Sequence, residues 1–412
     1  MSSVESAAVW AVSACAVGGI LVRPRRTPEW VWAVAGGALA AAVSAMSAPE
    51  VARAVMRGAD VYAFLIGILS LAELARAERV FDVIALRFVG AAGGSQARLF
   101  AWIYGAGTLV TALLSNDTTV VVLTPAVLAV LGRTDVTPLP YLYACAFVAN
   151  AASFLLPVSN PANLVLFGHG LPSLLPWLQA FGGAAIAAIV LTYAALRLFY
   201  RQALHEPYHV SDPTMGRTAT WTAALLTASA AALIAASALG VNVGYTALGA
   251  AAVCIAATGI RAPASAAAAL QQTTWSIVPL VAGLFVIVAA LDRSGAINLI
   301  RTVMVRSESL ATGGVISIGA VVTIASNLFN NLPVALASGV AVQSTHVAPR
   351  IADATLVAVD LGPNLSVSGS LATLLWLVVL RREGINVTAW QFLQVGALVL
   401  LPALVAALLL VR

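Results

Sequence analysis

The chain has 412 residues, of which 61% are hydrophobic and 9% are charged. A soluble globular domain has about 25% charged residues, so this composition excludes a soluble protein and predicts an all-α, polytopic membrane protein. All 21 basic residues are arginines, and the formal net charge is +5. Because these arginines flank apolar segments, their charge indicates orientation in the bilayer and not binding to nucleic acid.

In the first half of the chain, several apolar segments are long enough to cross a bilayer, which takes about 20 residues. The predicted elements are spans near 5–22, 29–47, 59–77 and 174–200, a re-entrant hairpin at about 96–133, and a broken helix at about 139–168. Polar clusters interrupt only the last two elements, so we expect these two to differ from simple spans.

The hairpin prediction depends on the polar stretch Leu114-Ser115-Asn116-Asp117-Thr118-Thr119. It lies between two apolar arms that are each too short to span a bilayer comfortably. A carboxylate at membrane depth costs about 2.5–3.5 kcal/mol on insertion, so Asp117 indicates a functional site near the midplane. The alternative is a cytoplasmic loop whose polar side chains only cap a helix.

The broken helix is predicted from the run Pro157-Val158-Ser159-Asn160-Pro161-Ala162-Asn163. Proline removes a backbone donor and clashes with the preceding turn, so the span is interrupted or sharply kinked here. In lipid, the freed backbone groups need partners inside the protein or in a water-filled cavity.

The second half of the chain repeats the order of the first. Its predicted elements are spans near 218–238, 243–260 and 273–291, an amphipathic segment Ser294–Arg306, a hairpin at about 310–345, a broken helix at about 351–380, and a span from Thr388 to Val411. Each half thus has five transmembrane helices, one of them broken, and one re-entrant hairpin. This pattern indicates an inverted-repeat secondary transporter with two broken helices. The predicted domains are a first repeat (1–200), a cytoplasmic linker (201–217) and a second repeat (218–412).

The distribution of arginine agrees with this topology. With the amino terminus outside, fourteen arginines fall on the cytoplasmic side and seven fall outside. This bias has the sign that the positive-inside rule requires.

Three motifs resemble a known family. Asp360-Leu361-Gly362-Pro363, followed by Ser368-Gly369-Ser370-Leu371-Ala372-Thr373-Leu374-Leu375-Trp376, resembles the signature of the arsenite/antimonite efflux permeases. That family belongs to the ion transporter superfamily, with the divalent-anion/sodium symporters and the NhaD-type antiporters. The hairpin sequences Asn116-Asp117 with Thr124-Pro125, and Asn330-Asn331-Leu332-Pro333, also resemble the matching family segments. The resemblance covers the whole chain in segment order, but Asn364 stands where the family usually has a basic residue.

The resemblance implies a multi-pass protein of the bacterial inner membrane that exports arsenite or antimonite, with proton antiport as the coupling that we expect. Arsenite at neutral pH is mostly As(OH)3, whose hydroxyls need partners that both donate and accept hydrogen bonds. The predicted substrate-binding residues, all amides or hydroxyls, are Asn116, Thr118, Ser159, Asn160, Asn163, Asn330, Asn331, Asn364, Ser366 and Ser368. This set contains no arginine or lysine.

Asp117 and Asp360 are predicted to be the proton-coupling carboxylates. Both are expected at midplane depth, and neither has a cation next to it in the sequence. A buried carboxylate can bind and release a proton in the working pH range. For Asp360, the alternative is that it only caps a half-helix.

Two other functions remain open from the sequence. One is a sodium/proton antiporter in which Asp117 and Asp360 bind the ion, and the other is a carrier of organic or inorganic anions. We expect no enzymatic activity, no cofactor and no metal site, because no nucleotide-binding motif and no plausible metal-ligand set is present. The segments 96–168 and 310–380 are expected to move together against a scaffold that carries a homodimer interface. Nothing in the sequence indicates whether a soluble ATPase subunit binds.

Overall fold

The structure, a computed structural model, describes residues 1–132, 134–208, 220–345 and 347–411. Within these ranges the regular secondary structure is helical, apart from isolated bridge positions, of which Ser95 and Pro207 form one pair. Seven helices there are long and apolar enough to cross a membrane, or eight if the bent pair Ala48–Met56 and Ala59–Ala77 forms one span. The chain is therefore a multi-pass membrane protein.

The first part of the chain, up to residue 208, contains the elements that precede the linker. These are α1 (Ser3–Val22), α2 (Glu29–Val43), α3 (Ala48–Met56), α4 (Ala59–Ala77), α5 (Val80–Ala92), α6 (Gln96–Leu113), α7 (Asn116–Thr118), α8 (Thr124–Leu131), α9 (Leu139–Ala151), α10 (Pro161–Phe167) and α11 (Leu174–Phe199). The π-helical turn η2 (Thr119–Leu123) joins α7 to α8. Of the predicted linker, residues 201–208 are described, and 209–217 lie outside the described residues.

The second part of the chain follows the same order. It contains α12 (Thr220–Ala238), α13 (Val243–Arg261), α14 (Pro263–Gln272), α15 (Ile277–Arg293), α16 (Ala296–Glu308), α17 (Ala311–Phe329), α18 (Asn331–Ser344), α19 (Pro349–Leu361), the 3-10 turn η5 (Gly362–Leu365), α20 (Leu371–Arg382) and α21 (Ala389–Leu410). The sequence did not predict α3, α14 or the π-helical turn as separate elements.

The second predicted span ends earlier than residue 47 for a local reason. The Ser44 hydroxyl donates to the carbonyl of Ala40 at 2.7 Å, and Ala45 has a φ of 50°, so the helix stops at Val43. A capping box then starts α3, in which the Ser47 amide donates to a Glu50 carboxylate oxygen at 2.7 Å. Such a box satisfies backbone donors that a helix start leaves free. The corner after α2 is thus built by two serines.

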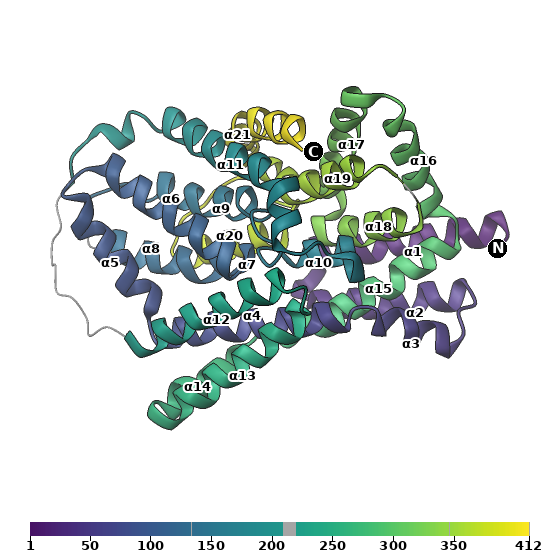
Figure 1. The fold of residues 1–412 in the computed structure, drawn as a ribbon, viewed down its shortest axis with the longest axis horizontal. Helices are drawn as coiled ribbons and strands as arrows, with labels where there is room; N and C mark the ends of the chain where they lie inside the picture. Colours follow the sequence, from purple (N-terminus) through teal and green to yellow (C-terminus); the bar gives the residue numbers. More distant parts are fainter. Residues whose placement is uncertain (133, 209–219, 346, 412) are drawn as a thin grey trace.

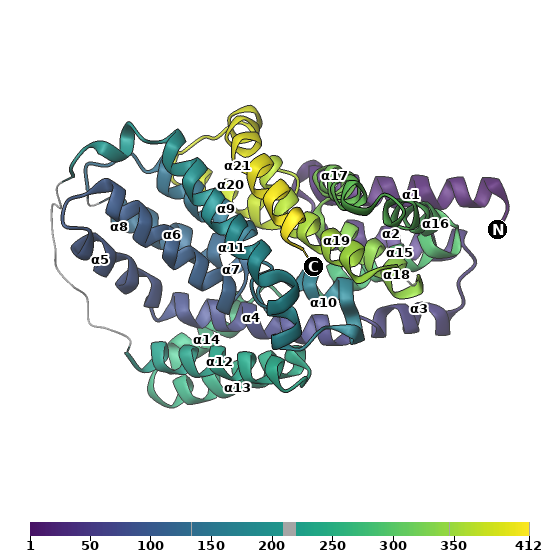
Figure 2. The same ribbon diagram turned by 45° about the horizontal axis from the view of Figure 1, so that its top comes forward.

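Helices from the two halves of the chain are interleaved (Figures 1 and 2). Figure 1 shows α5, α6 and α8 at one end, α1, α2, α3 and α16 at the other, and α9, α10, α19 and α20 between them. One hydrophobic cluster joins α1 and α2 to α15–α19, and a second joins α5–α9 to α20. Each cluster therefore contains helices from both halves.

The packing of the helices is reciprocal between the halves. α2 packs against α15 while α4 packs against α13, and α3 packs against α15 while α14 packs against α4. In the same way, α10 packs against α18, and α20 packs against η2 and α8. Each of these pairs joins an element of one half of the chain to an element of the other.

Two glycines permit close crossings of these helices. A Cβ atom at Gly67 on α4 would lie 2.4 Å from the carbonyl carbon of Ala247 on α13. A Cβ atom at Gly283 on α15 would lie 2.5 Å from the carbonyl carbon of Ala33 on α2. Small residues let backbones approach in a membrane, where van der Waals packing drives helix association. The two crossings therefore require glycine at these positions.

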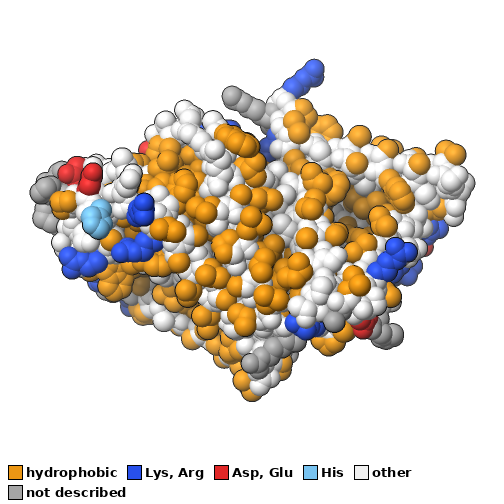
Figure 3. Space-filling view, turned by 90° about the horizontal axis from the view of Figure 1, so that it is seen from above, with side chains coloured by type: hydrophobic (Ala, Val, Ile, Leu, Met, Phe, Trp, Pro, Cys, Tyr) orange, Lys and Arg blue, Asp and Glu red, His pale blue; other side chains and the backbone are white. Residues whose placement is uncertain are grey.

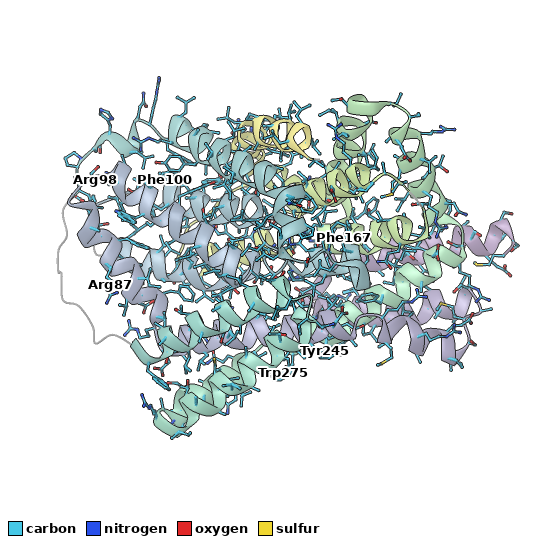
Figure 4. All side chains as sticks on the ribbon, in the orientation of Figure 1. Arg87, Arg98, Phe100, Phe167, Tyr245 and Trp275 are labelled. Carbon is cyan, nitrogen blue, oxygen red and sulfur yellow. The ribbon has the colours of Figure 1, made fainter. Side chains whose placement is uncertain are left out.

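The outer surface is suited to a bilayer. Figure 3 shows hydrophobic side chains over most of the face seen from above, with charged side chains near its margins. Large apolar side chains such as Ile186, Val253 and Ile260 are exposed on this type of surface. In Figure 4, Arg87 and Arg98 lie at one end of the molecule, away from the apolar middle.

We expect Gly67→Ala to destabilise the protein by about 1–3 kcal/mol, because the added methyl group overpacks the α4–α13 crossing. Thermal unfolding of the purified protein in detergent measures this change. The matched control is Gly249→Ala on α13, where a Cβ atom would meet nothing within 4 Å. Equal stability of the two variants would mean that the crossing tolerates a larger residue.

Candidate transport site

Two helices begin deep inside the protein, directly after the two interruptions. The side-chain oxygen of Asn160 accepts from the Ala162 amide at 3.0 Å and caps α10. The hydroxyl of Ser370 accepts from the Ala372 amide at 3.2 Å and caps α20. Both capping residues are buried. The interruptions predicted from Pro157–Asn163 and Asp360–Ser370 are therefore real breaks that end in capped helix N-termini.

The polar stretches between α6 and α8 and between α17 and α18 are capped in a similar way. The Thr118 amide donates to the Ser115 hydroxyl at 3.2 Å, and the Leu332 amide donates to the Asn330 side-chain oxygen at 3.3 Å. Asn330 has a φ of 71° and a ψ of 149°, a positive-φ conformation that is strained for a residue other than glycine. We call these two stretches the first tip (114–118) and the second tip (330–332).

Each tip is joined to the break that follows it in the chain. The Asn116 amide donates to the Ser159 carbonyl at 3.1 Å, and the Asn331 amide donates to the Gly369 carbonyl at 2.9 Å. Ser159 and Gly369 stand directly before the capping residues of α10 and α20. The two halves thus use one arrangement for pairing backbone groups that the breaks set free.

Side chains connect the two breaks across the halves. Asn160 donates to one carboxyl oxygen of Asp360 at 2.8 Å, and Asn150 donates to the side-chain oxygen of Asn364 at 2.9 Å. Asn364 in turn donates to the carbonyl of Phe147 at 3.2 Å. The four polar residues of these pairs are almost completely buried. The predicted residues Asn160, Asp360 and Asn364 therefore meet at the centre of the molecule.

Three buried amide or carboxyl oxygens at the breaks lack partners in the described part of the chain. They are the second carboxyl oxygen of Asp360 and the side-chain oxygens of Asn150 and Asn163. The Ser153 hydroxyl lies beside the Asp360 carboxyl, although it donates to the carbonyl of Asn150. Buried polar atoms are nearly always paired, so unpaired ones indicate a place for a proton, a cation, water or a hydroxyl-bearing ligand.

Asp117, on the first tip, has a different environment. It is partly buried, and its backbone amide donates to the side-chain oxygen of Asn116 at 2.9 Å. No hydrogen bond or ion pair of the described residues uses its carboxyl group. The side chain of Asn331, on the second tip, is also free of such bonds. Both tips therefore keep polar atoms available for a ligand.

Other predicted binding residues use their donors inside the protein. Asn163 donates to the carbonyls of Ser153, Leu156 and Pro157, so it closes the first break. Ser366 donates to the side-chain oxygen of Asn327, and Ser368 donates to the Asn327 carbonyl. Thr118 shares a hydrogen bond with Ser115, and the Ser159 hydroxyl donates to the carbonyl of Ala112. In this conformation these donors stabilise the tips and breaks.

Two residues of the site were missed from the sequence. Asn150 lies within the apolar run of α9, where a single amide was the only signal. Asn327 donates to the carbonyls of Thr323 and Gly362 at 2.8 and 2.9 Å, which ties α17 to the second break. The position of Asn327 in the polar stretch 326–333 could have indicated it, but Asn330 and Asn331 of that stretch were predicted as the binding residues instead.

A cavity of about 360 Å³ opens near these elements, among α4, α10, α15, α16 and α18. Its lining includes Asp60, Asp292, Arg301 and Gln343. Arg301 on α16 donates to Asp292 on α15 at 2.8 Å and to Ser344 on α18 at 2.8 Å. Figure 4 labels Phe167, which ends α10 beside this region. The cavity is polar at its charged rim, unlike the surrounding apolar surface.

The membrane-spanning fold, the paired tips and breaks, and the buried polar centre define a multi-pass membrane transporter. The chain belongs to the citrate transporter family, whose profile matches residues 17–362.

Individual relatives agree with this class. The arsenical pump membrane proteins of Escherichia coli K12 and Shigella flexneri are each 28% identical to this chain over 349 residues, which is 80% of either sequence. An uncharacterized transporter of Mycobacterium tuberculosis is 26% identical over 367 residues, which is 84% of either sequence. The resemblance that the sequence motifs indicated is thus confirmed.

We expect the Asn150–Asn364 pair to stabilise the fold. Asn364→Ala leaves a buried amide and a carbonyl unpaired, which costs about 1–3 kcal/mol of stability. A double-mutant cycle with Asn150→Ala should give a coupling energy of about 0.5–3 kcal/mol. Thermal unfolding in detergent measures both values, and strictly additive effects would mean that the pair contributes nothing.

Proposed function

We propose that this transporter exports arsenite or antimonite across the bacterial inner membrane by proton antiport. The observation that carries the proposal is the buried centre at Asp360, Asn160 and Asn150, which offers unpaired oxygen acceptors and no lysine or arginine. A neutral As(OH)3 molecule needs hydrogen-bonding partners but no counter-charge. The printed name of the Escherichia coli relative, an arsenical pump membrane protein, supports the same substrate.

We further propose that the two halves, 1–200 and 218–412, are inverted repeats joined by the linker 201–217. The reciprocal packing of α2 with α15 and of α4 with α13 supports a two-fold relation. So do the matching backbone bonds from Asn116 and Asn331. Under this relation, 96–133 and 310–345 are the corresponding hairpins, and 139–168 and 351–380 are the corresponding broken helices.

The predicted grouping of connecting segments on the two sides of the membrane is supported by polar contacts between distant segments. Arg293 donates to Glu50 at 2.7 Å, and the predicted topology assigns both residues to the outer side. The Tyr208 amide donates to the Gly94 carbonyl at 2.9 Å, and both belong to predicted cytoplasmic segments. Such contacts require that the paired segments lie on one side of the membrane.

In the proposed mechanism, Asp117 and Asp360 exchange protons for substrate. When these carboxylates are ionised, the tips and breaks present acceptors and amide donors to the hydroxyls of the substrate. Protonation removes the charge and one acceptor position at each carboxyl group, which weakens substrate binding. A site that cannot hold proton and substrate together couples the inward flow of one to the outward flow of the other.

The family description favours one second candidate, a carrier of citrate or a similar anion. A carboxylate substrate needs positive charge, which the N-termini of α10 and α20 supply only in part. The third function open from the sequence, sodium/proton antiport, would use the same two carboxylates.

The first test is arsenite accumulation in an arsenite-sensitive host. Cells that express the protein should accumulate less arsenite than cells without it. Asp117→Asn and Asp360→Asn should each remove this protection at normal expression, because the coupling group is lost. The exposed residue Glu383 offers a control, since Glu383→Gln should protect as well as the unchanged protein.

Transport measurements on everted membrane vesicles, made separately with arsenite, citrate and sodium, distinguish the three candidate functions. Uptake of citrate without arsenite uptake would replace the proposal with an anion carrier. Sodium-dependent proton movement without arsenite uptake would replace it with a sodium/proton antiporter. Normal arsenite efflux from both aspartate variants would mean that neither carboxylate couples transport.

We also propose that 96–168 and 310–380 form a moving unit against a scaffold. An apolar groove between α1, α15 and α17 supports a sliding boundary there, with Ala14 and Ala325 on its two sides. In a variant without native cysteines, a bifunctional crosslink between Ala14→Cys and Ala325→Cys should stop transport. A crosslink within the scaffold, between Trp10→Cys and Ser294→Cys, should not, since these side chains already share a 2.9 Å hydrogen bond. Full transport under a complete Ala14–Ala325 crosslink would favour local opening of the tips over a static frame.

A further inference from the structure

Three carboxyl groups follow α19 from its exposed end to the centre of the protein. The exposed Glu308 accepts a hydrogen bond at 3.2 Å from the amide of Ala348, the capping residue of α19. Asp353 lies near the start of this helix and Asp360 near its end. Residues seven apart share a helix face, and the rise of the helix places these two Cα atoms about 10 Å apart.

Asp353 is a buried carboxyl group that the proposed function has not used. The residue is 8% exposed, whereas Asp360 is completely buried. Within the described chain, no hydrogen bond or ion pair uses the Asp353 side chain, and none joins it to Arg350 one turn earlier. A buried carboxyl group without a partner is costly inside a membrane protein and is a functional-site hypothesis by default.

The elements packed against α19 do not neutralise Asp353. α10, α17, α18, α21 and η5 contain no acidic, basic, tyrosine or cysteine residue. The titratable and charged groups on the other packed elements are Arg301, Arg306 and Glu308 of α16, Tyr141, Tyr143 and Cys145 of α9, and Tyr193 and Arg197 of α11. Of the arginines, Arg301 is held by Asp292, Asn298 and Ser344. No described cation therefore pairs with Asp353.

The helix of the first half that would correspond to α19 is α9, and it has no such series of carboxyl groups. If Asn160 corresponds to Ser370 as the helix cap, Asn150 takes the place of Asp360 and Tyr143 the place of Asp353. α9 contains no carboxyl group in its whole length. The acidic line therefore leads to the centre only from the Glu308 end, which the predicted topology places outside.

We propose that Asp353 is a proton-relay residue that supplies Asp360 from the outer side. The inference rests on the proposed proton coupling at Asp360 and adds the route and its direction. The Asp353 carboxyl passes its proton, through water that enters between the helices, to the Asp360 carboxylate. Asp353 becomes ionised in that step and takes its next proton from outer water at the Glu308 end. Asp360 cannot load from α9, so uptake is one-sided, and Asp117 is left to serve the inner side.

The test measures proton arrival at Asp360 without any substrate. Infrared difference spectra of the purified protein after a pH jump identify the Asp360 carboxyl band by its loss in Asp360→Asn. In Asp353→Asn, and independently in Asp353→Ser, this band should form about 10-fold more slowly or worse, because a positioned proton carrier is lost. Asp353→Glu should restore the rate.

The control is Thr355→Val, which removes a buried hydroxyl from the same helix without removing a carboxyl group. In Thr355→Val the Asp360 carboxyl band should form at the same rate as in the unchanged protein. Slower formation in this variant would indicate distortion of α19 and would overturn the proposal. An unchanged rate in both the Asn and the Ser variant would also overturn it.

A second measurement separates this inference from the proposed function. In proteoliposomes, Asp353→Asn should slow proton-driven arsenite transport and leave arsenite exchange at equal pH within about twofold. If the unchanged protein moves no arsenite, the proposed substrate is wrong, and the infrared rates still decide the relay. If exchange falls as far as driven transport, Asp353 serves substrate binding and the relay is refuted.

Discussion

Backbone hydrogen bonding inside the bilayer is the constraint on which the rest of this structure depends. A helix that stops in hydrocarbon leaves amides and carbonyls that water cannot reach. Here each stop is paired with a tip, through the bonds from Asn116 to Ser159 and from Asn331 to Gly369. The polar residues that accompany these stops then gather in one place, because their backbones have already been brought together.

Contacts between the halves add to this pairing. The helices that follow the breaks pack across the halves, α10 against α18 and α20 against η2 and α8. The hydrogen bonds from Asn160 to Asp360 and from Asn150 to Asn364 also cross between the halves. The side chains at each break therefore find some of their hydrogen-bond partners in the other half, which explains why the two are interleaved.

Much of this architecture could be predicted from the sequence because lipid imposes simple rules. Span length, the proline-rich run 157–163 and the polar run 360–370 located the spans and the breaks, and the polar stretches located the tips. The early end of α2 could not be predicted, since it depends on the Ser44 hydroxyl and the left-handed Ala45 within an apolar run.

Within the site, the sequence indicated which residues are polar but not how they divide their bonds. Asn163 and Asn364 looked like ligand-binding amides, and the structure uses them to close the first break and to link the halves. Asn150 was missed because it is a single amide in an apolar helix, and Asp353 was missed because it lies seven residues before the Asp360 motif, near the start of α19. Only tertiary packing shows that such a residue faces the centre and not lipid.

The π-helical turn between α7 and α8 has a consequence for the resting protein. The second tip leads directly into the regular helix α18, whereas the first continues through a wider turn at Thr119–Leu123. An exact inverted repeat would relate the inward-open and outward-open forms by a two-fold axis and give them equal free energy. The two hairpins differ in winding, so under the proposed repeat the two forms of the empty transporter are not equivalent and one facing state is favoured. The arm Thr119–Leu123 is one source of this inequality.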